Sequence, residues 1–562
     1  MPSFTRIAAT VLQLSFLAND VFAAPSQEAP KLGAVASENA VCSKVGTDLL
    51  KAGGNAADAL VGTVFCVGVI AMYHSGIGGG GFMLVRGSDG KYEFIDFRET
   101  APAAAFEDMY TNNTDASLYG GLASGVPGEL RGLEYLHRNY GKLSWATVMA
   151  PAIKVAREGF EVGEDLIGQI NSTIPHDFLT DDPAWAIDFA PNGYLVRLGE
   201  TMTRKRYADT LETISKYGPD AFYTGPIAEA TIAALSASNG TMTLDDLENY
   251  KIALREPAEI DYRGYKLKSC SAPASGVVAL STLKIFEGYP DFADPVAINL
   301  TTHRLDQAMK FAYGQRTELG DPFFVDGLDE YQEWMVSNET AAQIRSKISD
   351  FTTQNVSYYD PGNLQSPQTH GTSHIVTADK SGLAISLTTT VNTIFASQLI
   401  VPETGIIMNN EMNDFSVPGA SNAYGYPPTP ANFIRPGKRP LSSISPTIAE
   451  TADGKLYFAI GSAGGSRIIT ATIQNLHHVL DQNLTTHEAL ASPRLHDQLI
   501  PPQVSFEYAY DNSTVEFLRS LGNNVTWEAP GGSTAQGLRL LPNGTFEAAG
   551  EPRQHDSGGF AV

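Results

Sequence analysis

The chain has 562 residues, of which 43% are hydrophobic and 18% are charged, a composition typical of a folded globular protein and not of a disordered or fibrous one. Its length fits either two or three separate cores or one large layered α/β unit. The formal net charge of -24 repels polyanions, and the 38 basic residues form no Lys/Arg-rich run, so we expect no nucleic-acid partner.

The N-terminus has the pattern of a cleaved signal peptide. Arg6 precedes an apolar stretch from Ile7 to Ala18, and a second short apolar segment ends at Ala23. We therefore predict that residues 1–23 are removed and that the protein is secreted, with a vacuolar lumen or a membrane anchor as alternatives. The stretch is short for a hydrocarbon layer of about 30 Å, which disfavours an uncleaved anchor.

Asparagine-linked glycosylation is consistent with such a route. Ten Asn-x-Ser/Thr sequons occur, although the sequence alone does not say which of them carry glycans. They begin at Asn112, Asn171, Asn239, Asn299, Asn338, Asn355, Asn483, Asn512, Asn524 and Asn543.

The chain has three cysteines, which excludes a disulfide-rich scaffold and a cysteine-rich zinc site. Cys42 and Cys66 flank an alanine-rich stretch with helical character, and they can pair in an oxidising compartment. The alternative is that Cys66 is simply a small buried hydrophobic residue. We favour the pair and take Cys270 as unpaired.

The first two thirds of the chain are predicted to be mostly helical. A buried helix is expected from Lys44 to Ile70, before a glycine-rich run. Helical patterns recur through residues 122–160, 207–247 and 305–348, with Pro, Gly and Asn between them.

The pattern changes to strands at Thr372. Residues 374–378, a turn at 379–382 and residues 383–391 predict a β-hairpin. Residues 456–460 predict another strand, which is followed by a Gly-rich turn and a helix. We interpret the Pro-rich stretch 418–440, which is also rich in aromatic residues, as an ordered loop over a site.

Thr372 opens the predicted hairpin directly after Gly371, and it is a candidate nucleophile. A threonine hydroxyl needs a base, and an N-terminal threonine has one in its own α-amino group, whose pKa is about 8. The chain would have to be cut between Gly371 and Thr372, by attack of the same hydroxyl on the Gly371 carbonyl. Taken alone, a threonine at the start of a strand is more often structural.

Several separated motifs occur together with Thr372 and, as an ordered set from about residue 32 to the C-terminus, resemble the gamma-glutamyltransferase family. The resemblance implies an α/β N-terminal-nucleophile (Ntn) hydrolase fold, an αββα sandwich of two interwoven subunits from one self-cleaved precursor. Residues 24–371 would form the large subunit and 372–562 the small catalytic subunit. The motifs are Gly53–Ala59, Ser75–Phe82, Phe97–Pro102, Thr372-Ser373-His374, Thr390-Val391-Asn392, Asn410–Phe415, Pro440–Ser443 and Gly461–Gly465.

The family's substrate is a gamma-glutamyl compound such as glutathione, and its glutamyl head has an α-carboxylate and an α-ammonium. Arg98, Ser442 and Ser443 can bind the carboxylate, with Arg98 bidentate. Asp414 and Glu411 can bind the ammonium, with Asn392 as a neutral acceptor. The alternatives are a surface salt bridge of Arg98 with Glu99 or Asp96 and an ordinary acidic loop at 411–414.

Two further features complete the predicted catalytic set. Gly464 and Gly465 lie between a strand and a helix, where free N–H groups can stabilise an oxyanion, although a plain tight turn is the alternative. By the resemblance, Thr390 binds the nucleophile; otherwise it is an ordinary strand residue.

Gly76, Gly78 and Gly81 match a dinucleotide fingerprint, but a predicted strand follows instead of a helix, so we expect no nucleotide site. We expect no metal and no organic cofactor.

We therefore predict a gamma-glutamyl transferase and glutathione hydrolase. It would form a gamma-glutamyl ester on Thr372 and pass it to water, amino acids or dipeptides. One alternative is a family acylase for another amide, which the polar set around Arg98 disfavours because such a substrate would leave it unpaired. The other is an inactive secreted binding glycoprotein, which would remain one uncut chain.

Overall fold

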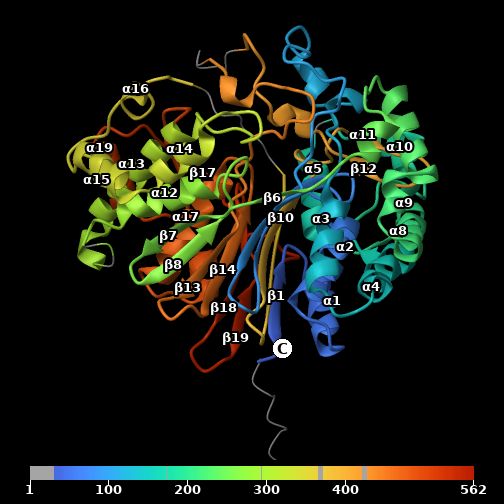
Figure 1. Ribbon diagram of the computed structural model, residues 1–562, viewed down its shortest axis with the longest axis horizontal. Helices are drawn as coiled ribbons and strands as arrows, with labels where there is room; N and C mark the ends of the chain where they lie inside the picture. Colours follow the sequence, from blue (N-terminus) through green and yellow to red (C-terminus); the bar gives the residue numbers. More distant parts are fainter. Residues whose placement is uncertain (1–30, 174, 291, 293, 365–370, 421–426) are drawn as a thin grey trace, which may run out of the picture.

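The computed structural model describes residues 31–173, 175–290, 292, 294–364, 371–420 and 427–562. Two β-sheets lie face to face between two layers of helices (Figure 1). This is the αββα sandwich that the resemblance implied. The predicted signal peptide lies outside the described residues.

In the described part of the chain the first sheet has seven antiparallel strands, and its centre holds the hairpin predicted at Thr372. Strand β9 lies between β1 and β10, so segments from both predicted subunits alternate within one sheet. In order across the sheet, the strands are β20 (Gly558–Ala561), β1 (Gly33–Ser37), β9 (Ser373–Asp379), β10 (Ala384–Thr390), β2 (Gly80–Arg86), β3 (Tyr92–Asp96) and β6 (Ala253–Arg255).

The second sheet is also antiparallel and again mixes segments from before and after residue 372. Its strands in order are β19 (Phe546–Ala549), β18 (Thr534–Leu540), β14 (Leu456–Ala463), β13 (Thr447–Thr451), β8 (Tyr265–Ser269) and β7 (Ala258–Tyr262). The short strands outside the two sheets are β4 (Phe160–Glu161), β5 (Thr201–Met202), β11 (Leu399–Ile400), β12 (Ile407–Met408), β15 (Leu495–His496), β16 (Val504–Glu507) and β17 (Val525–Glu528).

One apolar cluster joins the first sheet to its helices, and another joins the second sheet to its own. The first layer contains α1 (Ala40–Lys51), α2 (Ala56–Ile70), α3 (Glu129–Tyr140), α4 (Trp145–Glu158), α5 (Glu164–Ser172), α6 (Phe178–Asp181), α7 (Pro183–Phe189), α8 (Lys205–Tyr217), α9 (Asp220–Tyr223), α10 (Pro226–Ala237) and α11 (Leu244–Glu248). The second contains α12 (Gly276–Phe286), α13 (Ile298–Arg316), α14 (Leu328–Met335), α15 (Asn338–Lys347), α16 (Val356–Tyr359), α17 (Arg467–Leu480), α18 (Thr486–Ala491) and α19 (Asn512–Ser520).

The single helix predicted from Lys44 to Ile70 is wrong, because the structure has two helices there, α1 and α2. Gly53, with φ of 96°, lies in the turn that follows α1. Asn55 then caps α2: its side chain accepts from the N–H of Asp58, and the Asp58 carboxylate accepts from the N–H of Asn55. This reciprocal cap starts a new helix where the sequence pattern suggested continuity.

Side-chain alternation in β9 decides which residues face the space between the sheets. Val376 belongs to the apolar cluster between the sheets, whereas Ile375 packs against the first helical layer. His374 therefore faces the second sheet, and its Nδ1 lies 2.8 Å from Oγ1 of Thr388. Thr372 enters this strand at the end of the inter-sheet space.

Cys42 and Cys66 form a disulfide that joins α1 to α2, and Cys270 is free and buried. This is the pairing that the sequence favoured. Nine of the ten sequon asparagines are exposed; Asn299 is half-buried and accepts a hydrogen bond from the Thr514 hydroxyl at 2.7 Å. Among the described residues, no helix has both the length and the apolar character needed to cross a membrane.

Candidate active site

Thr372 lies where the chain enters β9, in a backbone conformation that is disfavoured for a β-branched residue. Its φ is 113°, and that of Gly371 is 121°. A Cβ at position 371 would lie 2.0 Å from the carbonyl oxygen of Asn392, so only glycine fits there. Cleavage of the bond between Gly371 and Thr372 would relieve the backbone strain at Thr372.

A series of hydrogen bonds leads from Thr372 to an acidic segment. The Thr372 hydroxyl lies 3.5 Å from Oγ1 of Thr390, at the end of β10. The same Thr390 oxygen accepts from the N–H of Asn392 at 2.7 Å. The Asn392 side-chain amide donates to the carbonyl of Asn410 at 2.9 Å, directly before the short helix η4 (Glu411–Asp414). The predicted nucleophile and the predicted ammonium-binding residues thus belong to one connected site.

Arg98, which is 1% exposed, lies at the centre of the polar cluster. Its guanidinium donates to the carboxylates of Glu411 and Asp414, and its Nε donates to the carbonyl of Pro440 at 3.4 Å. A surface salt bridge is therefore the wrong interpretation of this arginine. Oε2 of Glu99 is 3.8 Å from Nη1 of Arg98, so three carboxylates surround one guanidinium.

Several carboxylate oxygens of this cluster have no hydrogen-bond partner among the described residues: both oxygens of Glu99, Oε2 of Glu411 and Oδ1 of Asp414. Burial raises the pKa of Glu411 to about 8, and Arg98 offsets part of the shift. Burial also raises the pKa values of Glu99 and Asp414 above their ordinary range. Buried oxygens without partners are costly, so the cluster is suited to receive a cation with several N–H donors.

Ser442 and Ser443 follow Pro440, whose carbonyl accepts from Arg98, by two and three residues, and both are at most 6% exposed. Oγ of Ser443 accepts from Nη2 of Arg316 at 3.1 Å, and Oγ of Ser442 accepts from the N–H of Ile444 at 3.2 Å. Each hydroxyl proton is therefore available to a ligand oxygen.

The predicted loop 418–440 is tied to this cluster, apart from residues 421–426, which lie outside the described part. Asn432 donates from its side-chain amide to the carbonyl of Asp414 at 2.7 Å. Its side-chain oxygen accepts from the N–H of Leu441 at 2.9 Å. The loop thus connects the acidic segment to the serine pair.

Gly464 and Gly465 follow β14 at the same end of the sandwich as Thr372. Oγ of Ser386 donates to the carbonyl of Ile460 at 3.0 Å, and a Cβ on Gly461 would lie 2.3 Å from the His374 ring. Ser386 lies opposite Val376 in the first sheet, so Ile460 lies near residue 376 and Gly461 lies near residue 374. Strand β14 therefore runs toward Thr372, and the glycine pair at its end lies near that residue.

The N–H groups of this glycine pair find no acceptor among the described residues. Neither Gly464 nor Gly465 donates a backbone hydrogen bond there, and Gly465 is buried. Gly464 has φ of 120°, and a Cβ at this position would lie 2.4 Å from the carbonyl oxygen of Gly532. Free, buried N–H groups are rare, and they are the donors that an oxyanion requires.

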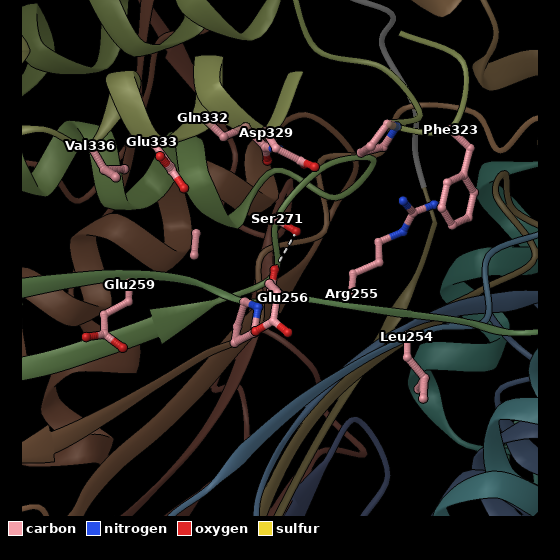
Figure 2. Close-up of a pocket in the computed structure, with 13 residues that line it drawn as sticks. Leu254, Arg255, Glu256, Glu259, Ser271, Phe323, Asp329, Gln332, Glu333 and Val336 are labelled. Atoms are coloured by element: carbon pink, nitrogen blue, oxygen red, sulfur yellow. Dashed lines mark hydrogen bonds between the residues drawn. The ribbon is translucent and has the colours of Figure 1, made fainter. Parts of the chain in front are cut away.

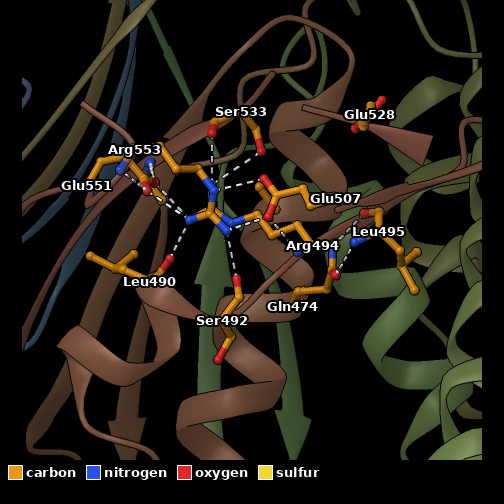
Figure 3. Close-up of polar contacts among 12 residues, drawn as sticks. Gln474, Leu490, Ser492, Arg494, Leu495, Glu507, Glu528, Ser533, Glu551 and Arg553 are labelled. Atoms are coloured by element: carbon orange, nitrogen blue, oxygen red, sulfur yellow. Dashed lines mark hydrogen bonds and ion pairs between the residues drawn. The ribbon is translucent and has the colours of Figure 1, made fainter. Parts of the chain in front are cut away.

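A buried ionic network supports the segment on which this loop rests (Figure 3). Nη1 of Arg494 donates to the carbonyl of Ser533 at 2.9 Å, next to Gly532, and Nη2 pairs with Glu551 at 2.8 Å. Arg553 joins Glu551 to Glu507, with contacts of 2.9 and 2.6 Å. The backbone that contacts Gly464 is thereby anchored to the C-terminal part of the chain.

A groove of 610 Å³ lies elsewhere, between the start of β7 and α14 (Figure 2). Its walls include Glu256, Asp329 and Glu333, but none of the predicted site residues. In the described part of the chain no group of three or more His, Cys, Asp or Glu side chains is placed to hold a metal ion.

The structure brings together Thr372, Thr390, Asn392, Glu411, Asp414 and Arg98, and it links Ser442 and Ser443 to the same cluster through Pro440. The sequence indicated Glu99 only as an alternative salt-bridge partner of Arg98, and it gave no indication of Arg316. Glu99 adjoins Arg98 within the motif Phe97–Pro102, so its position could have indicated a role in the site. Arg316 lies on a helix with no motif, and only the tertiary structure places it at Ser443.

The chain is similar to known proteins both in sequence and in fold. The sequence model of the family described as Gamma-glutamyltranspeptidase matches residues 42–561. The chain is 57% identical to the glutathione hydrolase proenzyme of Arthroderma benhamiae, over 95% of this chain and 93% of the relative. It is 52% identical to the glutathione hydrolase of Aspergillus flavus, over 100% and 95%. The crystal structure of cephalosporin acylase from Bacillus halodurans superposes with a TM-score of 0.80, 26% identity and coverage of 97% and 99%.

Proposed function

The chain belongs to the gamma-glutamyltranspeptidase family and is a glutathione hydrolase, and from this premise we propose that it cuts itself before Thr372 and uses the new N-terminal threonine as its nucleophile. The observation that carries this assignment is the hydrogen-bonded path from Thr372 through Thr390 and Asn392 to the cluster around Arg98. It joins a nucleophile to a site of the right polarity for a glutamyl head.

The cluster around Arg98 matches the two charged groups of that head. The unpartnered oxygens of Glu99, Glu411 and Asp414 can accept the three N–H bonds of an α-ammonium. Glu411 and Asp414 each accept a hydrogen bond from one terminal nitrogen of Arg98. Arg98 therefore does not have all of its terminal N–H groups free for the bidentate binding predicted for the substrate carboxylate. Arg98 offers its remaining N–H groups to that carboxylate.

Ser442 and Ser443 add two hydroxyl donors for the same carboxylate. A substrate without the α-amino and α-carboxyl groups would leave all these polar atoms unpaired, which disfavours the acylase alternative. The identities of 57% and 52% to glutathione hydrolases, against 26% to the acylase, point the same way.

The chemistry follows from these positions. The α-amine of Thr372 takes the proton of its own hydroxyl, and Oγ1 attacks the γ-carbonyl carbon of glutathione. The N–H groups of Gly464 and Gly465 stabilise the oxyanion of the tetrahedral intermediate. Collapse releases cysteinylglycine, which takes the proton, and leaves a gamma-glutamyl ester on Thr372. Water then yields glutamate, and an amino acid or dipeptide yields a new gamma-glutamyl compound.

Secretion is part of the proposal, with a vacuolar lumen or a membrane anchor as alternatives. The disulfide between Cys42 and Cys66 is stable in an oxidising compartment. The nine exposed sequon asparagines are accessible to a glycosylating enzyme. The large and small subunits of one precursor are the partners that the interleaved strands support.

The decisive experiment compares wild type with Thr372→Ala on denaturing gels after deglycosylation, with N-terminal sequencing of each band. We expect two wild-type fragments, one beginning Thr-Ser-His-Ile, and an intact variant that does not release cysteinylglycine from glutathione. A wild-type chain that stays whole would contradict self-cleavage. Faster turnover of an amide without the α-amino and α-carboxyl groups would favour the acylase.

A further inference from the structure

Glu38 is a buried carboxylate, 3% exposed, that follows β1 and precedes α1. Its Oε1 accepts from the hydroxyl of Ser373, the first residue of β9. Its Oε2 accepts from Nδ1 of His74 at 2.8 Å and from Nε2 of Gln554 at 3.2 Å. One side chain therefore contacts three segments that lie far apart in the sequence.

Two of these segments adjoin the candidate catalytic site. Ser373 is the residue directly after Thr372. The carbonyl of His74 accepts from the N–H of Val391 at 3.0 Å, and Val391 lies between Thr390 and Asn392. The third contact reaches Gln554, whose Oε1 accepts from Gln536 of β18 at 3.0 Å, in the second sheet.

We propose that Glu38 is a positioning residue for Thr372: its carboxylate joins the strand that follows the nucleophile to His74, whose carbonyl binds the backbone between Thr390 and Asn392. This inference rests on the proposed function. The two segments must keep a fixed separation, because the Thr372 and Thr390 hydroxyls lie 3.5 Å apart. The pairing of β9 with β10 brings the two hydroxyls together, and a carboxylate bonded to both sides restrains their separation further with two atoms of one rigid group. Self-cleavage and turnover use the same hydroxyl, so both depend on it.

Two substitutions break different arms of this bridge. Ser373→Ala removes the bond to the nucleophile strand and leaves Glu38 bonded to His74. Glu38→Gln leaves one acceptor oxygen where the carboxylate had two, so it can no longer accept both from Ser373 and from His74 with Gln554. If the bridge acts as a unit, losing either arm should have the same consequence, and losing both should add little.

Ser43→Ala is the matched control. Ser43 is also fully buried at the junction of β1 and α1, where its hydroxyl lies 2.7 Å from that of Ser37 and donates to the carbonyl of Gly558 at 2.7 Å. It makes no contact with β9 or with residues 390–392 among these bonds. The control therefore reports the cost of removing a buried hydroxyl from this region.

The experiment measures the self-cleavage rate of purified precursor, and kcat and KM for glutathione hydrolysis, in wild type, the three single variants and the double variant Ser373→Ala/Glu38→Gln. Wild type must cleave itself and turn over glutathione; if it does neither, the proposed function fails before the inference is reached. We expect each bridge variant to lose about tenfold or more in self-cleavage rate and kcat. KM should change less than about threefold, because Arg98 and its partners bind the head.

Nonadditivity provides the sharper readout. The kcat of the double variant should lie within about threefold of the kcat of the less active single variant. If the two effects were independent, the two fold-losses in kcat would multiply. The inference is overturned if Ser373→Ala and Glu38→Gln retain the kcat of Ser43→Ala, or if their effects multiply. If Ser373→Ala does not fold, Glu38→Gln alone decides: a normal kcat overturns the inference, and a loss in kcat with little change in KM supports it.

Discussion

The hydroxyl oxygens of Thr372 and Thr390 lie 3.5 Å apart, although the two residues are eighteen positions apart in the sequence. The distance follows from the hairpin, because β9 and β10 pair antiparallel with Ser373 opposite Thr389. Thr390 also accepts from the N–H of Asn392, so its hydroxyl is held in place before any substrate binds.

Thr390→Val should therefore impair catalysis while keeping the shape of the side chain. The variant loses the oxygen beside the nucleophile, and we expect kcat for glutathione hydrolysis to fall by about 10²-fold or more. Thr390→Ser restores the oxygen and should recover most of the activity. A Thr390→Val enzyme with wild-type kcat would show that this contact is structural only. Steady-state kinetics on the fully processed enzyme give the comparison.

Arg98→Lys should weaken binding of the glutamyl head. Lysine offers a compact ammonium in place of a planar fork, so it cannot bridge Glu411 and Asp414 in the same way. We expect KM for glutathione to rise by about tenfold or more.

Arg157→Lys is the control for Arg98→Lys, because Arg157 forms two exposed ion pairs, with Asp209 and Glu212. It should leave kcat and KM unchanged. An unchanged KM for Arg98→Lys would remove Arg98 from the substrate site.

Binding of the head should strengthen as pH rises from 6 to 8. Burial raises the pKa of Glu411 to about 8, so the Glu411 carboxyl is protonated in the empty site below that pH. An α-ammonium favours the ionised carboxylate, so its binding must expel that proton, and the affinity increases as the proton is lost. The inhibition constant of L-glutamate against glutathione hydrolysis should fall by about tenfold between pH 6 and pH 7.

Glu411→Gln tests the origin of this pH dependence. The substitution removes the titrating carboxyl but keeps the side-chain shape, so the slope of the inhibition constant with pH should flatten. If wild type shows no slope between pH 6 and 8, the protonated carboxyl does not control binding.

Gly464→Ala should disable the oxyanion site. The added Cβ would meet the Gly532 carbonyl at 2.4 Å in a backbone conformation with φ of 120°. Displacing one oxyanion donor typically costs about 10²- to 10³-fold in kcat.

Gly454→Ala is the control for Gly464→Ala. Gly454 also has a positive φ, 74°, but a Cβ added there would meet no atom within 4 Å. That control should lose about 1–2 kcal/mol of folding free energy and keep its kcat. Equal losses of kcat in the two variants would argue against an oxyanion role for residue 464.

Much of the fold was predictable because its signals are local. The alternation of residues 374–378 and 383–391 predicted the hairpin of β9 and β10, and the structure confirms it. The helix predicted from 44 to 70 was wrong, since the cap at Asn55 depends on side-chain hydrogen bonds that hydrophobic periodicity does not reveal.

The site was predictable only in part. The candidate residues were predicted from the order of motifs along the chain, which resembles one family, and the structure places several of them in one hydrogen-bonded cluster. Their pairing was not: Arg98 was expected to await a substrate carboxylate, whereas it is bonded to Glu411 and Asp414, more than 300 residues away. Such contacts depend on burial, which brings opposite charges together once water is removed.

The sequence by itself therefore determined the family and the hairpin at Thr372, and it predicted the nucleophile, the polarity of the binding residues and the glycine pair, since each of these depends on residue type and on near neighbours. Only the tertiary structure decided that three carboxylates surround Arg98, that the Gly464 loop rests on a segment held by Arg494, and that Glu38 connects Ser373 to His74. The physical reason is that buried polar groups must find partners wherever the chain brings them, and those partners come from segments with no fixed spacing in the sequence.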